Sequence, residues 1–74
     1  MNERLSQLKI GEKGKVVRMD YNDKQRLYDL GIIEETEIEV MYKSPFGNPT
    51  AYLIRGTVFA LRDDTADMIV VEKI

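Results

Sequence analysis

Residues 41–62 read MYKSPFGNPTAYLIRGTVFALR, and this stretch predicts two chain reversals in succession. The first lies at 44–49, where Pro45 and Pro49 each fix φ at about −65° and push the residue before them toward extended geometry. Gly47, between the two prolines, allows a positive φ. The loop is therefore expected to be stiff, and it carries one large apolar side chain, Phe46, at its tip.

The second reversal is predicted at Gly56-Thr57, because a two-residue type II′ hairpin turn needs glycine at its first central position. Strands are expected on both sides of this turn, over 50–55 and 58–62. Before the first reversal, residues 35–42 alternate between apolar and polar side chains, which is typical of a half-buried strand. The alternation assigns Ile38, Val40 and Tyr42 to one face, and Glu37, Glu39 and Met41 to the other.

Two further strands are expected near the ends of the chain. Residues 11–14 are typical of a turn, and a first strand is predicted over 15–19. A last strand is predicted over 68–74, with Ile69 and Val71 on one face. About five short strands in 74 residues indicate a mainly β fold, built as a small, strongly bent sheet or a partly open barrel.

One short helix is predicted over 22–30, inserted after the first strand. Asn22 can cap it, and Gln25 three residues later completes a capping-box pattern. Gly31 fits the left-handed residue that ends many helices, and this geometry would bring Ile32 against Leu27. Because so short a helix is unstable alone, Leu27 and Leu30 are expected to pack on the sheet.

The composition excludes several classes of function. We expect a single domain over 1–74. We also expect no cofactor and no enzymatic activity, because the chain has no histidine, no cysteine and no serine in a nucleophile motif. The net charge of −2 disfavours nucleic acid as a partner. No apolar run is long enough to insert into a membrane and no signal peptide is evident, so a cytoplasmic protein is expected.

Several motifs together resemble the FeoA family. They are the helix segment RLYDLGI at 26–32, the alternating strand at 36–42, the loop SPFGNP at 44–49, Arg55-Gly56 and Ala60-Leu61-Arg62. The resemblance extends from Leu5 to Val71. It implies an SH3-like barrel and a role in ferrous iron uptake, as the small cytosolic partner of the FeoB-type membrane transporter. It also implies a likeness to the C-terminal domain of iron- or manganese-dependent repressors.

The predicted docking residues lie on the loop and the helix. They are Pro45, Phe46, Gly47, Asn48 and Pro49 on the loop, and Arg26 and Asp29 on the side of the helix away from the core. Leu27, Leu30, Gly31 and Gly56 are predicted to be structural. An apolar side chain on a stiff loop costs little entropy to immobilise in a partner. Two alternatives stay open for Phe46: it anchors a partner, or it folds back onto Tyr42 or Tyr52 and closes the barrel end.

An acidic cluster is the only candidate for a metal site. Asp63, Asp64 and Asp67 offer oxygen ligands to a hard divalent cation. We favour the alternative that they charge and cap a turn before the last strand, because the ligand spacing of an EF-hand is absent. Ferrous iron also prefers some imidazole. The word iron in the implied function therefore refers to the pathway.

Nucleic-acid binding is the alternative function that a small barrel suggests. The basic residues near the first strand and the helix are Lys13, Lys15, Arg18, Lys24 and Arg26, with Tyr21 and Tyr28 among them as stacking groups. Acidic residues are interleaved with them, which favours a solvated surface of mixed charge. Weak self-association, through an edge strand or the Phe46 loop, is a further alternative.

Overall fold

The computed structural model describes residues 2–20, 24–46 and 48–74, and it consists of strands with three short helical segments. In chain order the elements are β1 (Asn2–Arg4), a 3₁₀ helix (Leu5–Gln7), β2 (Lys13–Met19), α1 (Lys24–Asp29), β3 (Glu37–Lys43), β4 (Thr50–Ile54), β5 (Thr57–Leu61), α2 (Asp63–Ala66) and β6 (Ile69–Lys73). The predicted mainly β architecture with one helix inserted after the first long strand is confirmed.

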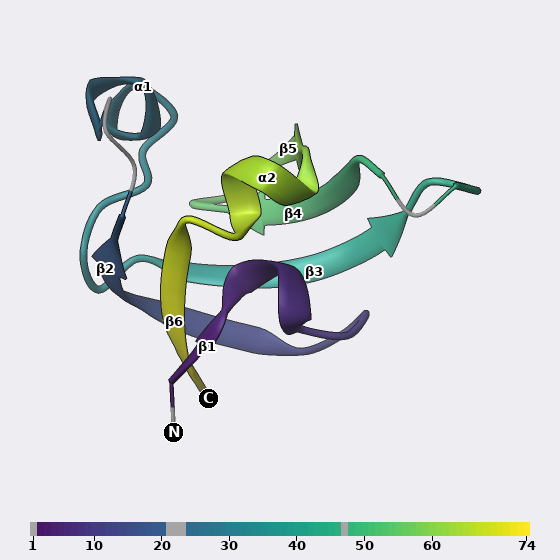
Figure 1. Ribbon diagram of the computed structural model, residues 1–74, viewed down its shortest axis with the longest axis horizontal. Helices are drawn as coiled ribbons and strands as arrows, with labels where there is room; N and C mark the ends of the chain where they lie inside the picture. The colour runs from purple at the N-terminus through teal and green to yellow at the C-terminus, as the bar shows by residue number, and fades with distance from the viewer. Residues whose placement is uncertain (1, 21–23, 47) are drawn as a thin grey trace.

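All six strands belong to one antiparallel sheet, in the order β1-β6-β2-β3-β4-β5. The sheet bends around the core, and β1 and β5 form its two outer edges (Figure 1). The sequence predicted about five strands. The additional one, β1, has three residues and no alternating pattern, so only its pairing with β6 identifies it. Within the described residues, no helix is long and apolar enough to cross a bilayer.

The core lies inside the bend of the sheet and is almost entirely apolar. Its buried side chains are Leu5, Leu8, Val16, Met19, Leu27, Ile32, Ile38, Val40, Tyr52, Ile54, Leu61, Ala66, Ile69 and Val71, with Leu30 and Phe59 packed partly against them. Ile69 and Val71 share the inner face, as predicted. Leu27 is fully buried and Leu30 is partly buried, so the predicted inward orientation of this helix face is confirmed.

Helix α1 ends in the predicted left-handed cap. Gly31 has φ of 85°. The N–H of Ile32 donates to the Leu27 carbonyl over 2.9 Å, and the N–H of Gly31 donates to the Tyr28 carbonyl over 2.9 Å. These two bonds define a Schellman motif, and Leu27 and Ile32 are both buried beside it. The predicted N-cap, Asn22, lies outside the described residues.

We expect Gly31→Val to lower the free energy of unfolding by about 1–3 kcal/mol, because a β-branched residue is strained at positive φ. A β-carbon at this position would also lie 3.0 Å from Cδ of Arg55. Chemical denaturation measures the change, with Gly31→Asn as the matched variant, since asparagine tolerates this conformation better. Equal midpoints for the wild type and the valine variant would contradict the cap geometry.

The second hairpin turn lies one residue earlier than predicted. Ile54 pairs with Thr57, so the two turn residues are Arg55 and Gly56. Both have positive φ, 51° and 82°. That combination is a type I′ turn rather than the expected type II′, and it matches the twist of the flanking strands. The prediction at Gly56-Thr57 was wrong because it assigned glycine to the first central position, and here glycine occupies the second.

Tyr42 does not face the core, contrary to the prediction. The pairing of β3 with β4 shifts between Val40, opposite Tyr52, and Tyr42, opposite Ala51. This β-bulge at Met41 reverses the alternation, so Tyr42 is 61% exposed. A similar shift between Val16 and Arg18 interrupts β2. The predicted inward assignment of Ile38 and Val40 is confirmed, since both lie before the bulge.

Strand β2 begins two residues earlier than predicted, because Gly14 belongs to the sheet rather than to a turn. Gly14 pairs with Ile38 on one side and Lys73 on the other. A β-carbon at Gly14 would lie 2.6 Å from Cγ2 and 2.7 Å from Cβ of Val71. Glycine is therefore required here by the close approach of two strands, which the sequence pattern alone does not reveal.

Because Tyr52 is buried, we expect the protein to lose stability in alkaline solution. Burial raises the pKa of this tyrosine to about 12, the carboxylates of Asp63 and Asp67 act in the same direction, and a hydrogen bond with Thr50 opposes them. Below pH ~10 the hydroxyl is neutral in both states, and between pH ~10 and ~12 only the unfolded chain ionises. The free energy of unfolding should therefore fall by roughly 2–3 kcal/mol over that interval. Denaturation of the wild type and of Tyr52→Phe at several pH values measures this contribution. If the free energy of unfolding fell equally with pH in both proteins, the expectation would be contradicted.

Candidate docking site

Two hydrogen bonds hold the loop between β3 and β4. The N–H of Ser44 donates to the Pro49 carbonyl over 3.2 Å and closes the loop at its base. The side-chain oxygen of Asn48 accepts the N–H of Asp63 over 3.0 Å, which attaches the loop to the start of α2. The peptide bond between Asn48 and Pro49 is cis. These two hydrogen bonds attach the base of the loop and its Asn48 to the rest of the fold. Gly47 lies outside the described residues, and the stiffness expected from the two prolines stays a prediction.

Phe46 is 95% exposed. Of the two alternatives considered for this side chain, the one in which it folds back onto Tyr42 or Tyr52 is not the conformation observed. Tyr52 is already buried in the core, and Tyr42 is turned outward by the bulge. A fully exposed phenylalanine on a fixed loop offers apolar area to a partner at little entropic cost.

Two further apolar side chains on or beside β3 were not predicted as part of the site. Tyr42 lies two residues before the loop. The N–H of Gly11 donates to the Val40 carbonyl over 2.8 Å, and this bond places the neighbouring Ile10, 58% exposed, beside the middle of β3. We name Ile10, Tyr42 and Phe46 the hairpin patch. Sequence patterns assign apolar residues of these types to the core. Only the bulge in β3 and the pairing of β2 with β3 show that these side chains are exposed.

The helix residues predicted for docking lie away from the loop. Helix α1 and the β3–β4 loop occupy opposite ends of the long axis of the molecule (Figure 1), which measures 29 Å over the Cα atoms. Asp29 is exposed, and its Oδ1 accepts a bond from Gln25 Nε2 over 2.8 Å, one helical turn earlier. The side chain of Arg26 lies outside the described part of the chain. The structure therefore separates the predicted site into two surfaces.

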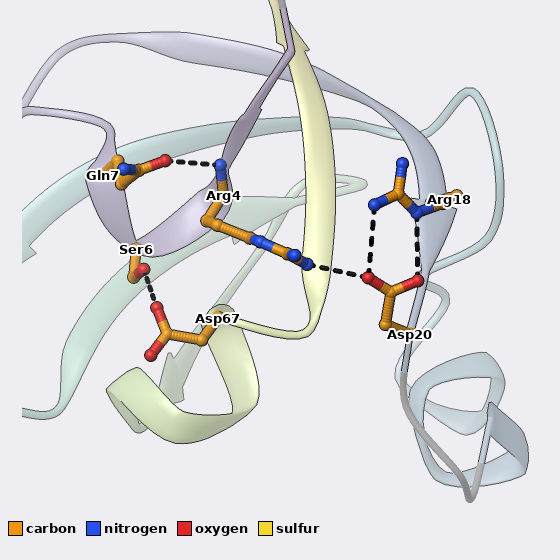
Figure 2. A network of polar contacts seen from close by, with 6 residues as sticks. All are labelled: Arg4, Ser6, Gln7, Arg18, Asp20 and Asp67. Atoms are coloured by element: carbon orange, nitrogen blue, oxygen red, sulfur yellow. Dashed lines mark hydrogen bonds and ion pairs between the residues drawn. The ribbon is translucent and has the colours of Figure 1, made fainter.

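The basic residues of β2 face acidic partners. Figure 2 shows Asp20 between two arginines: Arg4 Nη1 lies 2.8 Å from its Oδ2, and Arg18 Nε lies 3.0 Å from its Oδ1. Hydrogen bonds from Arg18 and then Arg4 lower the pKa of the Asp20 carboxyl. Lys13 and Lys15 stand opposite Glu39 and Glu37 in the sheet register.

This interleaving matters for the nucleic-acid alternative. A phosphate backbone needs a stripe of unopposed positive charge. On β2, every basic residue has a carboxylate as its ion-pair or cross-strand neighbour. Lys24 and Tyr21, which were predicted to contribute to such a surface, lie outside the described side chains. The described part of this surface is thus of mixed charge.

The three predicted acidic ligands have separate roles. Asp63 and Asp64 occupy the first turn of α2, where negative charge is favoured. The Oδ1 of Asp64 accepts the N–H of Thr65 over 2.9 Å, and Asp67 accepts a hydrogen bond from Ser6 (Figure 2). Across the described residues, no three acidic side chains are grouped so that they could share a metal ion.

We expect the isolated protein to bind ferrous iron and zinc only weakly, because it lacks imidazole and thiolate ligands. Calorimetric titration of tag-free protein measures this directly. A stoichiometric site of sub-micromolar affinity, abolished in an Asp63→Asn/Asp64→Asn/Asp67→Asn variant, would contradict the expectation and assign the ligands to α2.

Comparison with known proteins gives a consistent family. The family model for the FeoA domain matches residues 3–73. The FeoA-like protein from Clostridium acetobutylicum is 33% identical, with a TM-score of 0.89 over 96% of this chain and 85% of that one. FeoA from Stenotrophomonas maltophilia, solved in complex with zinc and described as a prokaryotic SH3 domain protein, is 31% identical, with a TM-score of 0.80 over 97% of this chain and 89% of that one.

A manganese-dependent transcriptional repressor contains the same fold, with 23% identity and a TM-score of 0.86. The match covers 99% of this chain and 37% of the repressor. No curated protein matches the chain in sequence. The predicted SH3-like architecture is confirmed by these structures, although hydrogen bonds do not close the sheet into a complete barrel.

Proposed function

Because the chain belongs to the FeoA family, whose members serve ferrous iron transport, we propose that it is a non-catalytic accessory protein of bacterial ferrous iron uptake that docks on a FeoB-type transporter. The proposal places the chain in the cytoplasm, where the nucleotide-binding region of such a transporter lies. It assigns the chain no cofactor and no chemical step, in keeping with the absence of histidine and cysteine.

The observation that carries this proposal is the exposure of Phe46 on a fixed loop. Buried aromatic side chains dominate many protein interfaces, and they do so when little conformational freedom is lost on binding. The hairpin patch adds two further exposed apolar side chains, Tyr42 two residues before the loop and Ile10 beside β3. Pro45, Asn48 and Pro49 frame the anchor, and Lys43 is a charged residue at its rim.

The exposed side of α1, with Arg26 and Asp29, is a second proposed contact. Since this helix lies at the other end of the long axis, a partner that binds both surfaces must reach along the molecule. The hairpin patch is therefore the primary docking surface in this proposal, and α1 adds specificity through charge.

The proposal can be tested by titrating the isotope-labelled protein with the cytosolic region of the FeoB-type transporter and following backbone amide shifts. We expect the largest shifts at Ile10, Tyr42 and Phe46, with smaller ones around Asp29. Single-stranded oligonucleotides and an unrelated GTPase serve as controls. Shifts confined to β2 and produced by the oligonucleotide, with a steep salt dependence, would replace this function by nucleic-acid binding.

A further inference from the structure

The two outer edges of the sheet differ in how well they are protected. Natural edge strands avoid unwanted pairing by being short, by carrying charge or by being covered. Strand β1 has three residues, two of them Glu3 and Arg4, and Arg4 is held in an ion pair with Asp20. Strand β5 has five residues, TVFAL, without any charge, and its Val58 is 49% exposed. Only the β5 edge therefore lacks these protecting features.

The unpaired backbone groups of β5 can be assigned from the register. Ile54 and Thr57 flank a two-residue turn, so they form a hydrogen-bonded pair, and the pairs alternate from there. Thr57, Phe59 and Leu61 thus direct their N–H and C=O groups toward β4. Val58 and Ala60 direct theirs away from the sheet, where, within the described chain, β5 has no second neighbouring strand.

From this edge we infer that two copies of the chain pair through β5, forming a twofold-symmetric dimer with a continuous antiparallel sheet. An antiparallel pairing in which Val58 lies opposite the partner's Ala60 gives each outward N–H and C=O group of both strands one hydrogen bond. It places the twofold axis between Phe59 and the partner's Phe59, as a closed interface between identical surfaces requires. Any other register leaves one of these residues opposite the turn or the end of the strand.

The side chains around β5 are complementary in this register. A groove of about 450 Å³ lies at β5, and its lining includes Leu27 of α1, Leu30 just after that helix, and Asp64 and Thr65 of α2. Phe59 also lines it and is only half-buried. The partner's Phe59 would lie across the axis at the short distance of a non-hydrogen-bonded pair and would fill this groove.

The charges at the ends of the strand also match. The register brings the turn residue Arg55 of one copy to the segment of the partner that runs from Arg62 to Asp64, which has a net charge of −1. Symmetry produces this contact at both ends. Five residues of strand bury little surface, so the dimer should be weak and dependent on concentration.

Sedimentation equilibrium of the purified protein from about 10 μM to about 1 mM should show a rise from monomer to dimer mass. Val58→Lys places a charge on the edge and should keep the protein monomeric throughout. Val17→Lys is the matched control, because Val17 is also an exposed valine of the sheet, 37% exposed, but lies on the interior strand β2. Dimers that persist in Val58→Lys would overturn the inference.

Amide hydrogen exchange identifies the edge itself. At dimer-forming concentrations the N–H groups of Val58 and Ala60 should be protected at least about tenfold more than in dilute protein, while Phe59 should not change. Arg55→Asp and Asp63→Lys should each weaken the dimer, and their combination should restore it. A monomer at every concentration would refute the dimer; if Val58 and Ala60 then became protected only with the transporter's cytosolic region, the edge would instead bind a partner strand.

Discussion

Phe46→Ala is expected to weaken binding to the cytosolic region of a FeoB-type transporter by about 2–4 kcal/mol, roughly a 30- to 1,000-fold loss of affinity. The side chain is 95% exposed in the free protein, so its removal leaves no cavity in the core. The bonds from Ser44 to Pro49 and from Asp63 to Asn48 do not involve it, and the loop should keep its conformation. Calorimetric titration measures the loss, and an unchanged denaturation midpoint shows that the fold is intact.

Lys43→Ala is the control for this prediction. Lys43 ends β3 beside the loop and is exposed, but a charge at the rim of an interface contributes little to affinity. Tyr42→Ala should give an intermediate loss if the whole hairpin patch is buried by the partner. Wild-type affinity of the folded Phe46→Ala protein would remove the loop from the interface.

Gly14→Val is expected to lower the free energy of unfolding by about 3 kcal/mol, at the upper end of the range for overpacked cores. The new β-carbon would lie 2.7 Å from Cβ of Val71, an atom that moves only with the backbone of β6. No change of rotamer relieves that contact, so the strands must separate where β2 meets β6. For a domain of this size the midpoint of thermal unfolding should fall by roughly 12–24 °C.

Lys15→Val provides the comparison for Gly14→Val. It introduces the same side chain at the next residue of the same strand, but on the exposed face. Gly14→Val also removes glycine's backbone freedom from the unfolded chain and raises β-propensity, and both effects favour this variant over Lys15→Val. A lower stability of Gly14→Val must therefore come from the steric conflict. A Gly14→Val protein as stable as Lys15→Val would show that the two strands do not approach as closely as the structure indicates.

Local patterns predicted most of the fold. The alternation before Met41 placed Ile38 and Val40 on one face, which is buried, and glycine at 31 predicted the left-handed cap of α1 that the structure shows. The first depends on alternation along one strand and the second on glycine at one position, and a sequence displays both directly. The family resemblance then supplied the SH3-like architecture, and the FeoA family match and the S. maltophilia structure confirmed it.

What escaped prediction depends on register between distant strands. The bulge at Met41 adds one residue to β3 relative to β4, and only the pairing with Tyr52 and Ala51 reveals it. The requirement for glycine at position 14 arises from Val71, which is far along the chain. The type I′ turn was misplaced by one residue for a local reason, since Arg55 at positive φ is not a residue type that signals a turn.

The candidate site was predicted unevenly. The prolines predict a stiff loop, but the exposure of Phe46 could not be predicted, because the same sequence allows the ring to fold inward. Ile10 was not considered at all, since its place beside β3 depends on the bond from Gly11 to Val40. The separation of α1 from the loop is a property of the whole sheet, and no local pattern contains it.

The position of β6 between β1 and β2 has a consequence for how the chain is made. Of the six strands, β6 is the last to leave the ribosome, yet β1 and β2, the first two, both hydrogen-bond to it. When β1 through β5 of a nascent chain have left the ribosome, β1 still lacks the strand it pairs with, and Val16 still lacks its cross-strand neighbour Val71. Closing so long a loop costs entropy before any contact repays it. The domain must consequently fold as one unit after its last strand is released, rather than progressively from its N-terminal end during synthesis.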